Sequence, residues 1–390
     1  MTTNNVKAFT PRWKNDGERK QADPFAFIIH PINPKRDVAR KYPALGRLPV
    51  WLIEFLSIFY PPVFISQIQG ARSAATGRTL NGWFVACPLT PRMMLRLPPA
   101  VVYHKIVQTG RYAQRLGARI LGLGAFTSVV GDGGVTIARR LEIPVTTGDS
   151  YTVAVALDAV RKAARRMNIS LEKSTVAVVG AYGAIGSVCA QLLAPEAGKM
   201  MLIGRRPEPL QGVAEKVRAA AGPGRQIPVT TTTEIGRLAE AHVVVTVTSD
   251  VDAVIQPSHL RPGAIICDVA RPRDVSRQVA QRRQDVLVIE GGMVAVPGPI
   301  DFGFDFGFPP GMAYACMAET MALALEGQYV SYTLGKQIEL AEVETIDRIA
   351  TKHGFRLGGF RSFERAVTER EIAAVQVHSQ IGQASRLPVA

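Results

Sequence analysis

Cysteine is scarce in this sequence, and its few occurrences are scattered. The 390 residues contain four cysteines, with no C-x-x-C pair and no paired histidine spacing beside them: Cys87, Cys189, Cys267 and Cys316. This pattern argues against a structural zinc site and against a disulfide framework. We therefore expect no metal, and we expect a protein of the reducing cytosol.

The sequence also lacks an export signal, a nucleic-acid-binding pattern and internal repeats. Residues 1–23 are polar and charged, without the apolar centre of a signal peptide, so we expect a disordered lead-in. Basic residues do not alternate with aromatic ones, and no helix-turn-helix pattern occurs, which argues against nucleic acid as a partner. The net charge is nevertheless +14. It favours an acidic partner, either an acidic carrier protein or an anionic membrane.

Long apolar runs are missing as well. The most apolar segment, Leu48–Ile65, is interrupted by Glu54 and by the pair Pro61-Pro62, and it is too short to span a bilayer. A run of this length predicts a buried core helix. Two functional alternatives are a wall for a long acyl chain and a surface that rests peripherally on a membrane.

What the sequence does contain is a dinucleotide-binding pattern. In T-V-A-V-V-G-A-Y-G-A-I-G, Thr175–Gly186, an apolar strand leads into three glycines at three-residue intervals. The first glycine suits a tight turn, the second allows a pyrophosphate to approach, and a helix opening near Ala184 supplies amides to the anion. The residues expected to contact the cofactor here are Gly180, Tyr182, Gly183, Ala184, Ile185 and Gly186.

The residues after the next strand indicate which dinucleotide binds. An NAD site usually has an acidic residue about twenty positions after the glycines, whereas this chain has Gly204, Arg205 and Arg206. Guanidinium groups suit a 2′-phosphate, so we expect NADPH. The alternative is an ordinary strand-helix turn with the arginines on a solvated edge.

Alternating strands and helices predict a doubly wound α/β Rossmann domain over residues 166–300. An N-terminal α/β substrate domain over residues 24–165 precedes it, and residues 301–390 form a loop, a helix that carries Cys316 and C-terminal helices returning to the first domain. The expected strands are Thr175–Val179, Met200–Ile203, Gln226–Val229, His242–Thr246, Ala264–Cys267 and Val286–Ile289. Further cofactor contacts are expected where strands or turns end at the carboxyl edge, at Thr248, Asp268 and Gly292.

Cys316 is the candidate nucleophile. It lies near the start of a helix expected from about Met312 to Leu325, where a helix N-terminus lowers the pKa of a thiol. A thiolate flanked by small alanines is able to attack a carbonyl carbon. The alternative is that Cys316 is packed in a core, as free cysteines often are.

Several motifs in one order resemble the long-chain acyl-(acyl carrier protein) reductases of cyanobacteria, a group with shikimate-dehydrogenase-like folds. The likeness covers roughly residues 85–355. Besides the glycine motif, its pieces are G-L-G-A-F-T-S-V-V, T-T-G-D-S-Y-T, I-E-G-G-M-V and A-C-M-A-E-T-M-A-L-A-L-E-G.

The resemblance implies NADPH-dependent reduction of a fatty acyl thioester to an aldehyde through an acyl-cysteine at Cys316. Glu319, on the same helix face, would position a proton or orient the thiol, although a surface salt bridge is an equal alternative. The expected oxyanion and substrate contacts from the matching loops are Ser128, Thr147, Asp149, Ser150 and Tyr151.

The sequence departs from the reductase pattern at one motif, and two other functions remain possible alternatives. Where those reductases carry Thr-Gly-Asn-Thr-His, this chain ends the motif in Tyr151 and lacks the histidine. One alternative is an NADP-dependent dehydrogenase of a small hydroxy or amino acid, with Cys316 merely packed. The other is a non-catalytic protein that binds NADPH or acyl chains.

Overall fold

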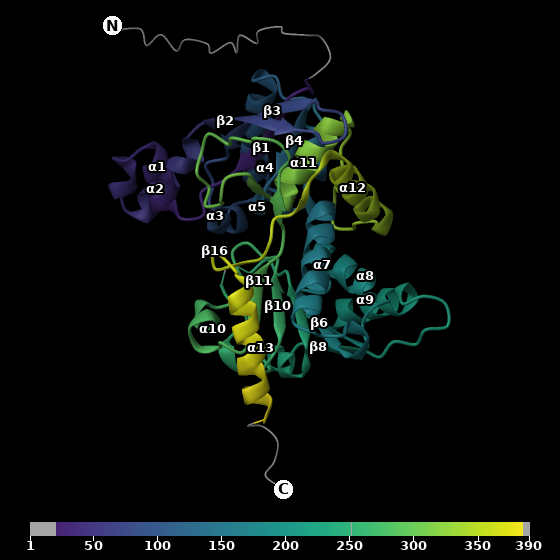
Figure 1. Cartoon of the computed structure of the whole chain (residues 1–390). Helices are drawn as coiled ribbons and strands as arrows, with labels where there is room; N and C mark the ends of the chain where they lie inside the picture. Colours follow the sequence, from purple (N-terminus) through teal and green to yellow (C-terminus); the bar gives the residue numbers. More distant parts are fainter. Residues whose placement is uncertain (1–20, 251, 385–390) are drawn as a thin grey trace, which may run out of the picture.

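The computed structural model describes residues 21–250 and 252–384, so most of the lead-in predicted for residues 1–23 lies outside the described residues. The first of its two main sheets has the strand order β2-β3-β1-β4-β5, in which only β2 is antiparallel to its neighbour (Figure 1). The strands are β1 Phe25–Ile29, β2 Val63–Arg72, β3 Thr79–Ala86, β4 Ile120–Leu123 and β5 Val145–Thr146.

Strand β1 explains how this sheet is covered on both faces. Its side chains alternate, so that Phe25 and Phe27 join one apolar cluster while Ala26 and Ile28 join another. The first cluster contains helix α11 (Ala315–Glu326), and the second contains helix α4 (Pro99–Arg115). The helix that carries Cys316 is therefore part of the first sheet's core.

The second main sheet is all parallel, with the order β11-β10-β9-β6-β7-β8. Its strands are β6 Thr175–Val179, β7 Lys199–Ile203, β8 Val229–Thr232, β9 Val243–Thr246, β10 Ile265–Asp268 and β11 Leu287–Glu290. The predicted doubly wound α/β fold is confirmed. Strand β8 starts three residues later than expected, because Val229 rather than Gln226 pairs with Met200 of β7.

The chain order reverses between β6 and β9, and an open sheet of this kind binds ligands at that point. Helix α8 (Ala184–Leu193) follows β6, and α9 (Pro207–Ala220) follows β7. Helix α7 (Asp149–Arg166) begins beside the first sheet and reaches the second, where Val160 and Ala163 enter its core. The start of α7 therefore lies between the two sheets.

The C-terminal helices divide between the two sheets. Helix α12 (Leu340–His353) packs on α11, with Ile346 in the first sheet's core. Helix α13 (Glu369–Ala384) was expected to return to the same domain, but it runs along the second sheet (Figure 1), with Ile372 in that core. The amide of Gln376 donates to the carbonyl of Arg166 at 2.7 Å, which fixes α13 there.

Shorter elements complete the fold. The helix expected from Met312 begins only at Ala315, because Met312–Tyr314 forms strand β13 and pairs with β12 (Met293–Ala295). The remaining α-helices and β-strands are α5 Phe126–Val129, α6 Val135–Arg139, α10 Arg277–Arg282, β14 Arg356–Leu357, β15 Arg361–Ser362 and β16 Arg365–Ala366.

Helices α1 (Pro34–Lys41) and α2 (Val50–Phe59) form a lobe at the side of the first sheet, near α3 (Pro91–Arg96) (Figure 1). Helix α2 occupies the apolar segment, and the prediction of a buried core helix is wrong. The side chains of Trp51 and Phe59 are 68% and 71% exposed. No helix of the described part of the chain is long and apolar enough to cross a membrane.

Candidate active site

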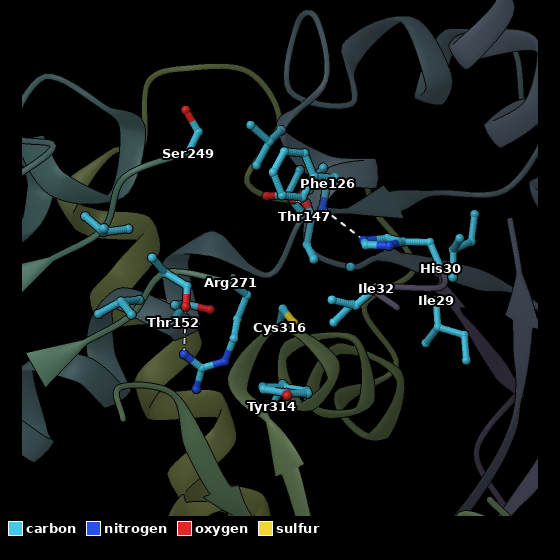
Figure 2. Close-up of a pocket in the computed structure, with 18 of the residues that line it drawn as sticks. Ile29, His30, Ile32, Phe126, Thr147, Thr152, Ser249, Arg271, Tyr314 and Cys316 are labelled. Carbon is cyan, nitrogen blue, oxygen red and sulfur yellow. Dashed lines mark hydrogen bonds between the residues drawn. The ribbon is translucent and has the colours of Figure 1, made fainter. Parts of the chain in front are cut away.

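A cavity of about 1070 Å³ lies between the two sheets and contains most of the residues singled out from the sequence. At one side it is bounded by the glycine turn after β6 and by the residues after β7. Cys316 lines it as well, and an apolar arm of the cavity is lined by residues of α1 and α2. In the close-up, the sulfur of Cys316 lies between Arg271 and Tyr314 on one side and His30 on the other (Figure 2).

The glycine turn after β6 depends on close backbone contacts that a side chain would block. Gly180 has a φ of +79°, and a Cβ atom there would lie 2.6 Å from the carbonyl oxygen of Val247. Gly183 caps the N-terminus of α8, and a Cβ atom on Gly186 would lie 2.3 Å from the Gly180 oxygen. The first two glycines line the cavity, whereas Gly186 lets the helix pack closely on the turn.

The residues after β7 form a cationic end of the cavity. The Arg205 side chain is 80% exposed, with its guanidinium 3.8 Å from Asp250. Arg206 lies over the ring of Tyr182, with 5.4 Å from its guanidinium carbon to the ring centroid. Gly204 leaves room for that ring, since a Cβ atom would lie 2.4 Å from it. Both guanidinium groups and an aromatic face are thus available to a dinucleotide bound at the glycine turn.

Cys316 is the second residue of α11, directly after β13. Its thiol is half-buried and lines the cavity. Burial, with additional effects of the nearby carboxyl groups of Asp149 and Glu319, raises the pKa of the thiol to about 12. The expected lowering by the helix N-terminus is therefore wrong as a net effect, because the amides of Cys316 and Met317 act in that direction but are outweighed.

Glu319 is completely buried and is not a surface salt-bridge residue. Its carboxylate accepts the amides of Gly148 at 3.1 Å and Tyr151 at 2.9 Å, as well as the hydroxyl of Thr146. A carboxylate at this position binds the N-terminus of α7 and holds it against α11. Burial raises the pKa of Glu319 to about 7.

Asp149, the first residue of α7, lines the cavity. Burial and the charge of Glu319 raise the pKa of Asp149 to about 7. Gly148, just before it, has a φ of +79°, and a Cβ atom there would lie 2.2 Å from both Cα and Cβ of Cys316. The backbone before Asp149 therefore touches the candidate nucleophile directly.

Besides Gly186, three expected contacts do not line the cavity, namely Ser150, Tyr151 and Asp268. Ser150 and Tyr151 follow Asp149 on α7, and their side chains turn into the core: Thr333 donates to the Ser150 hydroxyl, and Tyr151 is 2% exposed. They cannot donate to a substrate oxyanion from these positions. Asp268 is also buried, and its carboxylate accepts the amides of Ala270 and Val275 instead of a ribose.

The other predicted residues do line the cavity, namely Ser128, Thr147, Ala184, Ile185, Thr248 and Gly292. Two of their hydroxyl groups already donate to the backbone, that of Ser128 to Ala125 at 2.7 Å and that of Thr147 to Thr333 at 2.6 Å. Thr248 donates its amide to Asp274 at 2.8 Å.

Sequence reasoning missed His30, Thr152, Arg271 and Tyr314, which also line the cavity. Arg271 pairs with Glu290 at 3.2 Å and lies over the ring of Tyr314 at 5.7 Å. Burial lowers the pKa of His30 to about 4, so its ring is neutral, and it accepts the amide of Phe126 at 3.3 Å. Thr152 lies three positions after Asp149 and so shares its helix face. This spacing could have predicted Thr152 from the sequence.

The apolar arm of the cavity begins beside Cys316. Its nearer walls are formed by apolar side chains from the ends of β1 and β2 and from the Phe-Gly loop, namely Ile29, Ile32, Ile65, Phe304 and Phe306. Its other end is lined by residues of α2 and of the segments before and after it, namely Leu45, Leu48, Ile53, Leu56 and Tyr60.

A Rossmann sheet, a glycine turn and arginines around one cavity support an oxidoreductase. Comparison with known proteins agrees: the family model described as shikimate / quinate 5-dehydrogenase matches residues 161–290. Over 311 residues, the chain is 29% identical to the long-chain acyl-[acyl-carrier-protein] reductase of Synechococcus elongatus, covering 76% of this chain and 87% of that protein. The resemblance predicted from the motifs is thereby confirmed.

Two further proteins are similar to this chain, one over only part of its own length and the other with a low TM-score. The chain is 29% identical over 307 residues to the aminotransferase PigE of a Serratia species, where the match covers 77% of this chain but spans only 35% of the relative. Among solved structures, L-tryptophan dehydrogenase from Nostoc punctiforme aligns over 93% of this chain and 89% of its own, with 12% identity and a TM-score of 0.39.

Proposed function

We propose that this protein reduces a long-chain acyl thioester to a fatty aldehyde, with NADPH as cofactor and an acyl-Cys316 intermediate. The observation that carries the proposal is a single cavity that joins the glycine turn, the Cys316 thiol and an apolar arm. A small hydroxy or amino acid has no use for such an arm, whereas a fatty chain fills it.

The first step transfers the acyl group to sulfur. Because the pKa of Cys316 is raised to about 12, a base must take its proton, and the nearby Asp149, with a pKa raised to about 7, is suited to that role. The sulfur forms a bond to the acyl carbon, the bond to the carrier thiol breaks, and the proton passes from Asp149 to that departing thiolate.

The tetrahedral oxyanion of this step needs donors. The first amides of α11 lack helical partners, and those of Cys316 and Met317 already lie at the sulfur. With Ser150 and Tyr151 buried elsewhere, these backbone groups are the donors that we assign to the oxyanion. Glu319 acts indirectly, as a positioning residue that fixes the start of α7.

The residues present fit the proposed cofactor. The turn at Gly180 and Gly183 leaves room for a pyrophosphate, and Arg205 and Arg206 suit a 2′-phosphate. Bound there, NADPH would supply a hydride to the acyl carbon, and the bond from that carbon to the Cys316 sulfur would break to release the aldehyde and the cysteine thiolate. The net charge of +14 suits an acidic acyl carrier protein as the donor of the acyl group.

Acyl transfer can be tested without the cofactor. The protein is incubated with a palmitoyl thioester in the absence of NADPH, and intact mass spectrometry is used to look for a palmitoyl adduct. We expect an adduct on the wild type and none on Cys316→Ala, with Cys87→Ala as a matched control that retains it. No adduct on the wild type and no aldehyde with NADPH would refute the proposal.

The raised pKa of Cys316 favours one second candidate, an NADP-dependent dehydrogenase of a small hydroxy or amino acid in which the thiol is not used. Turnover of such an acid that is unchanged in Cys316→Ser would support this alternative.

A further inference from the structure

Helix α2 presents two different faces. Trp51, Phe55 and Phe59 recur every four residues and form an outward stripe, in which the ring centroids of the two phenylalanines are 5.5 Å apart. These three side chains are 68%, 54% and 71% exposed. A stripe of exposed aromatic side chains without a charge is unusual for a helix in water and marks an interaction surface.

The opposite face of α2 is a wall of the cavity. Ile53 and Ser57, one turn apart, are buried, and both line the apolar arm together with Tyr60. Glu54 accepts the Thr90 hydroxyl of the α3 cap at 3.1 Å, and the carbonyl of Tyr60 accepts the Lys105 amine at 2.9 Å. The helix is therefore a one-layer partition between the apolar arm and the outside of the molecule.

The elements next to α2 carry exposed basic side chains. Lys35 of α1, Arg47 before α2, and Arg92 and Arg96 of α3 are all exposed. Between the two arginines of α3, Leu95 is 54% exposed and adds to the apolar surface. The acidic residues of this region are engaged, since Glu54 binds Thr90 and Asp37 binds Arg36 at 3.2 Å.

We propose that α2 and its basic surroundings dock on an anionic phospholipid bilayer, with Trp51, Phe55 and Phe59 inserted among the lipid chains. Exposed aromatic side chains insert at the boundary between lipid headgroups and acyl chains, and lysine and arginine side chains on neighbouring elements bind anionic headgroups. In this orientation, only the thickness of α2 separates the apolar arm from the hydrocarbon. A fatty product would then pass into the bilayer without crossing water. This role of the docking rests on the proposed function.

The surface favours a bilayer over a protein partner. An acidic carrier protein needs cations but no row of exposed aromatic rings, and a second copy of the chain would place the same cations opposite one another. A bilayer with anionic headgroups accommodates both the rings and the cations.

Vesicle binding tests the proposal without substrate or cofactor, so its outcome is independent of the chemistry at Cys316. The full chain is floated with vesicles of phosphatidylcholine alone or mixed with phosphatidylglycerol, and Trp51 emission is followed. We expect binding to the mixed vesicles with a blue shift that Trp51→Phe abolishes. The double variant Phe55→Ser/Phe59→Ser should bind at least about tenfold more weakly.

Matched controls separate this effect from a general loss of apolar surface. Val330 and Val377 are 52% and 57% exposed elsewhere, and Val330→Ser/Val377→Ser should bind as the wild type does. Arg92→Glu/Arg96→Glu should lose the preference for anionic vesicles. The proposal is overturned if the folded wild type, as judged by circular dichroism, binds neither vesicle. It is also overturned if the phenylalanine variant changes only self-association or binding to an acidic carrier protein.

Discussion

The contact between Gly148 and Cys316 gives the sharpest test of the site. In Gly148→Ala, the new methyl group would lie 2.2 Å from Cα and Cβ of Cys316, whereas carbon atoms pack at about 3.5 Å or more. The two backbones must therefore separate by about 1.3 Å. A displacement of about 1 Å at a reacting group typically costs about 100-fold in rate.

Two costs in folding stability accompany this displacement. Alanine at a φ of +79° costs about 1–2 kcal/mol for the left-handed backbone. Overpacking against α11 adds about 1–3 kcal/mol. The variant should still fold if the protein has ordinary stability, but with a lowered unfolding midpoint.

The assay is the single-turnover rate of acyl transfer to Cys316 from a palmitoyl thioester, measured by intact mass. Gly224→Ala is the matched control, since Gly224 has a φ of +75° but no atom within 4 Å of its would-be Cβ. It should show the backbone cost in stability and a wild-type acylation rate. Gly148→Ala protein that is folded and acylates as fast as Gly224→Ala would refute the assignment of Cys316 as a positioned nucleophile.

Two further predictions concern the cofactor and the base. Arg205→Ala should weaken NADPH binding by about 10- to 100-fold through a lost charge-assisted hydrogen bond, and leave NADH binding unchanged. A fluorescence titration measures the affinity for each cofactor, and Arg218→Ala is the control because Arg218 is exposed elsewhere. An equal loss of affinity for NADPH and NADH would contradict a 2′-phosphate site. Asp149→Asn should slow acyl transfer by about 10²- to 10⁴-fold and remove the wild-type decline in rate as the pH falls through about 7. The Asp149 carboxyl keeps its proton up to about pH 7 in the folded protein but loses it near pH 3.8 in the unfolded chain. The wild-type free energy of unfolding should therefore fall as the pH rises from 3.8 to about 7, and it should fall less in Asp149→Asn. Thermal unfolding measured at several pH values checks this.

The second sheet was the most predictable part of the fold. Apart from the edge strand β8, its strands are buried on both faces and therefore read as continuous apolar runs, and the glycines after Val179 identify the turn to α8. Elements that depend on distant partners were not predictable in the same way. Met312–Tyr314 lies in an unbroken helical pattern, yet it pairs with β12 and so becomes a strand.

In the candidate site too, local sequence patterns predicted some residues and missed those that depend on distant parts of the chain. Asp149, Ser150 and Tyr151 are adjacent, and each step along a helix turns a side chain by about 100°, so only the observed start of α7 decides which one faces the cavity. His30 comes from the far end of the chain, and no local pattern links it to Cys316. The apolar segment was ambiguous because α2 has an apolar face on each side, one toward the cavity and one toward solvent.

The raised pKa of Cys316 follows from the same architecture that positions it. Burial is the main cause, and the charges of Asp149 and Glu319 add to it. The Glu319 carboxyl lies beside the thiol because it accepts the amides that hold the start of α7. The resting enzyme therefore holds an unreactive thiol, and a pH profile of acyl transfer should follow the base near pH 7 and not the thiol near 12. An alkylating reagent should accordingly modify Cys316 slowly at neutral pH, and rapid alkylation at pH 7 would show that the thiol is activated before any substrate binds.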